Sequence, residues 1–231
     1  MTTELRFSLS EDPGVVRRLQ FYVSEISLLR SDSRWTRLQL IADERWQSEQ
    51  VALLDLVGPP SERRSQVTGR VPQGSYTGVR FTLAVPFDLN HQNPLLAKAP
   101  LNRGELFWSW QSGYKFIRLE LTDQEHAGAF HLGSTGCSSA SALRPPTAAC
   151  AQPNVIRVEL NGFDPLSQPV LVRLADIVAA IQQSDQVACT GDYEREAACA
   201  AAFAITGLDV RSGQCTGENG ICSSQRLFAK P

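Results

Sequence analysis

Alternation of apolar and polar side chains is the feature that most limits the fold of this 231-residue chain. Six segments carry an apolar strand pattern: residues 5–9, 19–23, 51–56, 79–85, 117–121 and 156–160. Five of them alternate, as half-buried strands do, and 51–56 is a short continuous apolar run. With turn residues such as Pro72-Gln73-Gly74 between them, they predict seven or eight strands in a mainly β fold, an antiparallel sandwich-like architecture.

Helical patterns occur only late in the chain. Residues 174–183 place apolar side chains three and four apart, and residues 195–205 are rich in alanine, the best helix former. The stretches 59–65 and 138–153 have strand patterns on both sides, which makes them loops and not linkers. We therefore expect a single domain over residues 1–231, with one or two short helices near the C-terminus.

All six cysteines follow residue 136: Cys137, Cys150, Cys189, Cys199, Cys215 and Cys222. Taken as neighbours they are 13, 10 and 7 residues apart and would close three short local loops. No C-x-x-C pair is present, so zinc-ribbon and thioredoxin readings fail. We predict disulfides, each worth roughly 3 kcal/mol, with the pairing left open. Oxidised cysteines favour an exported, periplasmic or surface protein whose signal peptide has been removed.

Charge and composition exclude several function classes. A net charge of −2 gives no electrostatic case for binding nucleic acid or an anionic membrane. No apolar run approaches the roughly 20 residues of a membrane span. Ser134 lies in G-S-T-G and not in the hydrolase motif G-x-S-x-G, and no carboxylate pattern points to catalysis. We expect a protein that is not an enzyme.

A metal site is suggested by the histidines and tryptophans. Trp108 and Trp110 form a W-x-W motif, with His91 upstream on a loop leaving a strand and His131 downstream, where a loop is expected to begin. His126 lies among polar residues and looks solvent-facing. At strand spacing both indoles would share one face, and packing is the plain alternative. Imidazole suits copper, zinc, iron and nickel, but two imidazoles make an incomplete site.

Several motifs resemble one family over nearly the whole chain. They are FYVSEISLL, DLVG, VPFDLNHQNP, PLN at residues 100–102, FWSWQSGYKFIRLE, FHLGSTGC, NGFDP and GLDV. Together they resemble the MbnP-like family, also called the metallo-mystery pair four-Cys proteins. The resemblance implies a periplasmic protein that binds one copper ion. It also implies a di-haem partner (MbnH-like), related to MauG and cytochrome c peroxidase, that oxidises the first tryptophan of W-x-W to kynurenine.

Carried over to this sequence, the modified residue would be Trp108. An intact indole N–H is only a donor, whereas ring opening loses a carbon, gains an oxygen and frees an aryl amine that can bind metal. That amine with His91 and His131 would form a nitrogen site for Cu(I). Trp110 would point to the same side and shield the ion. Asn90, Tyr114 and Lys115 are expected beside the site, with plain packing an equal reading for Tyr114.

Two features depart from the family pattern, and two other readings stay open. The Cys215–Cys222 loop looks like an addition, and the N-terminal sequence with a further cysteine pair that members often carry is missing. The first alternative function is a ligand-binding or adhesive β-sandwich that uses exposed aromatics as a platform. The second is a copper enzyme, for which the sequence offers no further acid–base group.

Overall fold

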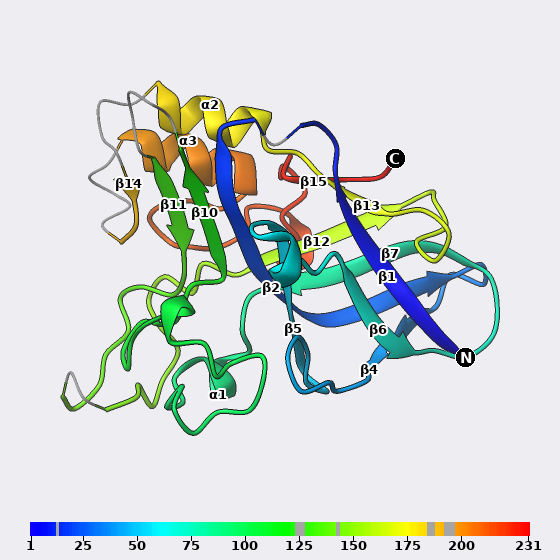
Figure 1. Ribbon diagram of the computed structural model, residues 1–231, viewed down its shortest axis with the longest axis horizontal. Coiled ribbons are helices and arrows are strands. Elements are labelled where there is room, and N and C mark those ends of the chain that lie inside the picture. Colours follow the sequence, from blue (N-terminus) through cyan, green and yellow to red (C-terminus); the bar gives the residue numbers. More distant parts are fainter. Residues whose placement is uncertain (13, 123–127, 142–143, 184–187, 192–196) are drawn as a thin grey trace.

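The computed structural model describes the whole chain except residues 13, 123–127, 142–143, 184–187 and 192–196 (Figure 1). One sheet has the order β15 (Phe228–Ala229), β13 (Val170–Val172), β1 (Thr2–Leu9), β6 (Gln66–Arg70), β4 (Gln39–Leu40). The larger sheet has the order β12 (Ile156–Asn161), β7 (Tyr76–Leu83), β2 (Val16–Arg30), β10 (Ile117–Leu121), β11 (Ala129–Leu132), β14 (Ala188–Cys189). Two more strands pair with β2, namely β3 (Trp35–Arg37) and β5 (Val51–Val57). A separate hairpin joins β8 (Phe107–Ser109) to β9 (Gly113–Tyr114).

Strand β2 organises the larger sheet because it pairs with four other strands. Its first half pairs with β10 and β5, and its second half pairs with β7 and β3. The register with β7 shifts between Ser24 and Ser27, where Glu25 has a left-handed φ of 52°. A bulge of this kind bends a strand and increases its twist. Two groups of strands are thereby built on the two halves of β2.

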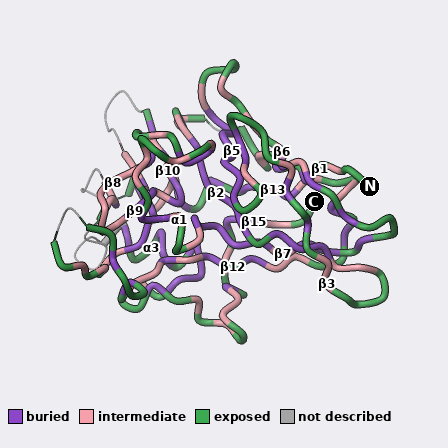
Figure 2. Tube along the Cα trace, turned by 90° about the horizontal axis from the view of Figure 1, so that it is seen from below, coloured by how far each residue is buried: buried purple, intermediate pink, exposed green. Residues whose placement is uncertain are grey.

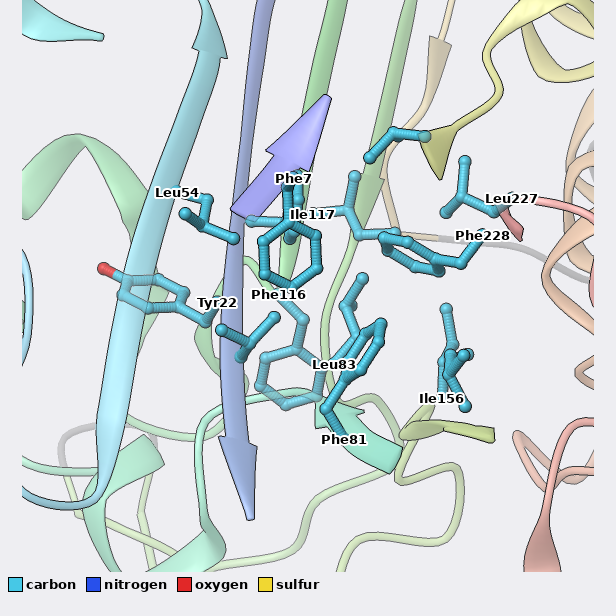
Figure 3. Close-up of a cluster of buried hydrophobic side chains, with 14 of the residues drawn as sticks. Phe7, Tyr22, Leu54, Phe81, Leu83, Phe116, Ile117, Ile156, Leu227 and Phe228 are labelled. Carbon is cyan, nitrogen blue, oxygen red and sulfur yellow. The ribbon is translucent and has the colours of Figure 1, made fainter. Parts of the chain in front are cut away.

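The core lies between the two sheets, as the aromatic cluster in Figure 3 shows. Phe7 of β1 meets Phe21 of β2 and Phe81 of β7 edge to face, with ring centroids 5.9 and 5.5 Å apart. Phe228 of β15 contacts Phe21 and Phe81 at 5.7 and 5.1 Å. Each such pair adds about 0.5–1.5 kcal/mol beyond area burial. Figure 2 shows buried segments along β2 and β7. The mainly β, sandwich-like prediction is confirmed.

Helices and disulfides occupy the predicted parts of the chain. Helix α2 (Ala175–Gln182) and helix α3 (Ala197–Thr206) lie together beyond β10 and β11 (Figure 1). The start of the predicted second helix, Arg195, falls outside the described residues. Three disulfides join neighbouring cysteines, Cys137–Cys150, Cys189–Cys199 and Cys215–Cys222, which confirms the bridges and settles their pairing. No described helix is long and apolar enough to cross a membrane.

Five of the six predicted strand segments lie wholly in strands, and the segment 79–85 runs two residues past the end of β7. The structure also adds elements that the pattern missed. Strand β2 runs on through Glu25 to Arg30, and α1 (Phe87–Asn90) forms one helical turn after Pro86. Short 3₁₀ turns also occur: η1 (Pro60–Glu62), η2 (Gly104–Leu106) and η3 (Glu218–Gly220). The buried apolar residues belong to one contiguous cluster, while the single-domain expectation stays a prediction.

Candidate metal site

Three segments that are far apart in sequence meet at the side chain of Asn90, which is 1% exposed. Its Oδ1 accepts a hydrogen bond of 2.8 Å from the backbone N–H of Tyr114. Its Nδ2 lies 3.4 Å from the carbonyl oxygen of Ser112 and 3.5 Å from Oγ of Ser134. One carboxamide therefore ties α1 to the β8–β9 hairpin and to the segment after β11. Three of the motifs that carried the family resemblance, VPFDLNHQNP, FWSWQSGYKFIRLE and FHLGSTGC, are therefore neighbours in space.

Gly113 allows this close approach. It has φ of +74°, and a Cβ built there would lie 2.3 Å from the carbonyl oxygen of Asn90. A side chain at this position would meet both backbone strain and a clash, so glycine alone fits. The position of α1 against the hairpin depends on it.

His91 ends α1 and is 5% exposed, in agreement with the expected place beyond a strand. Its Nδ1 donates to the carbonyl oxygen of Trp110 at 3.2 Å, because a carbonyl can only accept. The lone pair then belongs to Nε2, which lies 3.3 Å from Nδ2 of Asn90. Burial lowers the pKa of His91, although the bond to Trp110 opposes the shift. A neutral imidazole with one nitrogen fixed by a carbonyl is the form in which histidine binds metals.

His131 lies within strand β11, directly opposite Arg118 of β10. The sequence predicted that a loop begins here, which is wrong because the strand continues to Leu132. Nε2 lies 3.5 Å from Oε1 of Glu120. Burial, with the charge of Lys115 next in importance, lowers the pKa of His131 to about 4 despite the opposing carboxylate of Glu120. His131 is therefore also neutral near pH 7.

Trp108 is a half-buried residue of β8, and its indole rests on Gly133. A Cβ built on Gly133 would lie 2.6 Å from Cζ3 and 3.2 Å from Cε3 of the indole. This contact uses the benzenoid edge, and in an indole Nε1 lies on the side opposite Cζ3. Gly133 follows His131 by two residues, so the tryptophan lies at the end of the strand that carries the histidine.

Trp110 does not share a strand with Trp108. Strand β8 ends at Ser109, and Trp110 lies in the turn that follows, with its ring 6.1 Å from the ring of Phe107 in an edge-to-face contact. The prediction that both indoles share one face required Trp108 and Trp110 to lie in one strand. Trp110 lies in the turn, so this requirement is not met. Its backbone, through the carbonyl that accepts from His91, is the part in contact with the candidate site.

Tyr114 and Lys115 make contacts of different kinds. Tyr114 is fully buried, its hydroxyl donates to the carbonyl oxygen of Leu101, and its ring packs on Tyr22 and Phe107. Packing explains this residue. Lys115 is half-buried and donates through Nζ to the carbonyl oxygen of Glu105 at 3.0 Å. Burial lowers the pKa of Lys115.

A disulfide next to His91 was not anticipated as part of the site. Nε2 lies 4.0 Å from Sγ of Cys150, and the ligand atoms of His91, Cys137 and Cys150 lie within 4.8 Å of one another. Both sulfurs are bridged to each other, so neither is a thiolate ligand. His131 is not part of this group, and His126 lies outside the described residues. The only sequence signal for this neighbour was Cys137 at the end of the FHLGSTGC motif.

Comparisons with known proteins concern the family and the fold of the chain. The chain matches the family model of MbnP over residues 3–193. It is similar to the solved structure of MbnP from Methylosinus trichosporium, with a TM-score of 0.82 and 23% identity over 99% of this chain and 97% of that one. At this identity the likeness concerns the fold. None of the curated proteins gives a significant match. Because the family model covers most of the sequence, the chain belongs to the MbnP family.

Proposed function

We propose that this protein binds one copper ion through His91 and His131, together with a kynurenine formed from Trp108 by a di-haem MauG-like partner. Its role would be copper sequestration, storage or transfer in the periplasm. Membership in the MbnP family supports a copper-related, non-catalytic function. The observation that carries the proposal is the state of His91, a buried neutral imidazole whose Nδ1 is bonded to the carbonyl of Trp110.

The donor chemistry of His91 and His131 supports a copper site, because neutral imidazole is a copper ligand. Both histidines have pKa values lowered by burial, which keeps a lone pair available at neutral pH. His131 faces Glu120, the kind of carboxylate that orients a metal-bound imidazole. Bound there, copper would supply a metal centre held by nitrogen ligands, a donor type that suits copper. The contact between Asn90 Nδ2 and His91 Nε2 would have to give way to the metal.

The contact between Trp108 and Gly133 gives the modification a structural rationale. Opening the five-membered ring would leave the benzenoid ring intact, and that ring is the part packed on Gly133. Nε1 would become the nitrogen of an aryl amine while the packing keeps the side chain in place. The half-buried position of Trp108 also leaves part of the side chain accessible to a partner protein.

The test combines peptide mapping with copper titration. Protein made with and without the di-haem partner is digested, and the peptide spanning residues 106–115 is weighed for one carbon lost and one oxygen gained at Trp108. Copper affinity is then measured by competition with a chelator. We expect binding to collapse in His91→Ala, His131→Ala and Trp108→Phe, and to persist in His126→Ala. Equal losses in all three histidine variants would contradict the ligand assignment. Copper bound equally well beside an unmodified Trp108 would show a histidine site of another kind.

The alternative of an aromatic binding platform has less support. Trp108 and Trp110 are half-buried and pack on Gly133 and Phe107. The large apolar side chains that are most exposed among the described residues are instead Leu95 and Leu96, at 90% and 83%. Tryptophan fluorescence that responds to glycans and not to Cu(I) would favour the platform.

A further inference from the structure

A cleft of about 340 Å³ lies on the larger sheet, on elements that contribute nothing to the metal site. Its floor is formed by β2, β3, β7 and β12, and its lining includes Arg37, Arg80 and Arg157. Strands β7 and β12 lie side by side in Figure 1 and pair in antiparallel register. Arginine is the residue best suited to hold carboxylates and phosphates, because its planar fork bonds them through two donors.

The strand register places these arginines on one face. Ser27 of β2 is directly opposite both Arg37 of β3 and Arg80 of β7. Two residues further along β7, Thr82 is opposite Arg157 of β12. Residues two apart on a strand point to the same face. The three guanidinium groups therefore lie on the same face of the sheet, one each from β3, β7 and β12.

Charge in the cleft is unbalanced. Among the described residues, no carboxylate lies within ion-pair distance of Arg37, Arg80 or Arg157. Arg80 is oriented by stacking on the ring of Trp35 at 4.6 Å. The one carboxylate in the lining, that of Glu25, accepts a hydrogen bond of 2.8 Å from Thr82. Glu159 is opposite Arg80 on the same face, where it accepts a hydrogen bond of 3.0 Å from Asn161. Three guanidinium groups still outnumber the carboxylates of Glu25 and Glu159, so the cleft carries a net positive charge.

The opposite wall comes from the C-terminal segment. Asn219 and Ile221 line the cleft, and the N–H of Cys222 donates to the carbonyl of Arg157 at 2.8 Å. The Cys215–Cys222 disulfide closes this loop. Two lining residues, Asn219 and the bulge residue Glu25, have left-handed φ values of 54° and 52°. Left-handed non-glycine residues gather at ligand sites, where surrounding structure holds them in place.

We propose that this cleft binds a small ligand with at least two oxyanion groups, carboxylate or phosphate. Guanidinium groups on neighbouring strands would each pair with one anionic group of the same molecule. A volume of 340 Å³ corresponds to roughly ten water molecules, more than a single phosphate fills. The proposal stands apart from copper binding, since no residue is shared between the two sites.

Calorimetric titration of the full chain with citrate, pyrophosphate and inorganic phosphate, at constant ionic strength, tests the proposal. We expect citrate or pyrophosphate to bind more tightly than phosphate, and the preference between them identifies the carboxylate or phosphate source. Arg37→Gln and Arg157→Gln, both at exposed positions, should each weaken binding about tenfold or more. Glu25→Gln should strengthen it, because it removes a negative charge from the lining.

Arg70→Gln is the matched control. Arg70 is an exposed strand residue of β6 on the other sheet, and its replacement removes the same charge. It should bind like the unaltered protein. The proposal is overturned if none of the three anions binds at millimolar concentration. It is equally overturned if Arg70→Gln weakens binding as much as Arg157→Gln, or if Glu25→Gln weakens it. Circular dichroism confirms that each variant is folded.

Discussion

Replacing Gly133 with alanine tests whether the indole of Trp108 packs directly on this residue. The added Cβ would lie 2.6 Å from Cζ3 of Trp108 and 2.7 Å from the carbonyl oxygen of Tyr114, both closer than real contacts allow. The carbonyl belongs to Tyr114, which is fully buried, and cannot move cheaply, so the indole must be displaced. Overpacking of this kind costs about 1–3 kcal/mol. For a chain of this length each kcal/mol lowers Tm by about 2–4 °C, which gives a fall of roughly 2–12 °C.

Gly104→Ala is the control for this experiment. A Cβ on Gly104 meets nothing within 4 Å and its φ is not left-handed, so alanine should leave stability unchanged or raise it by about 0.4–1 kcal/mol. Thermal unfolding followed by circular dichroism measures stability, and peptide mapping after exposure to the partner measures modification of Trp108. We expect Gly133→Ala to lose both stability and yield of modification. If it unfolds at the same temperature as Gly104→Ala with the same yield, the indole does not rest on Gly133 and the reasoning fails.

Three further outcomes can be measured by denaturant unfolding. The folded state holds the pKa of His131 at about 4, below its usual 6.5. The free energy of unfolding should therefore be highest above pH 6.5 and fall by up to about 3 kcal/mol as the pH drops toward 4. His131→Gln should flatten this pH dependence. Asn90→Ala should cost about 1–3 kcal/mol, because it leaves the buried N–H of Tyr114 without its acceptor, and a change below about 0.5 kcal/mol would argue against the junction. Arg18→Met should cost about 3 kcal/mol or more, because it removes the 3.0 Å ion pair to the fully buried Asp55. Adding Asp55→Asn should restore much of the lost stability. If it does not, an uncompensated buried charge is not the cause of the loss.

The sequence predicted the strands where side-chain alternation was clean. Residues 117–121 and 156–160 fall in β10 and β12, and the alanine-rich stretch contains α3. It did not predict that β2 continues through Glu25, because a left-handed bulge breaks the period of two at that residue. Strands of two or three residues, such as β4, are too short to show any period.

For the candidate site, the sequence could nominate residues but not their arrangement. Motifs selected His91, His131 and Trp108, and the disulfide loops followed from cysteine spacing. Their arrangement depends on Asn90, whose hydrogen bonds span 24 and 44 residues of sequence. No local pattern encodes contacts of that separation. The neighbouring Cys150 was missed for the same reason, since it approaches His91 through a loop 59 residues away.

The C-terminal aromatic of the core has a consequence for how much of the chain forms a stable unit. The family model matches residues 3–193, yet Phe228 lies among the rings of Phe7, Phe21 and Phe81 (Figure 3). A fragment cut at residue 193 would lose this ring, and removing a buried phenylalanine side chain alone costs about 3–5 kcal/mol. Recombinant fragments designed on the recognisable motif would therefore be expected to expose the sandwich interior and aggregate. The core is complete only when the last strand of the chain, β15, packs its Phe228 against Phe7 of the first strand, β1.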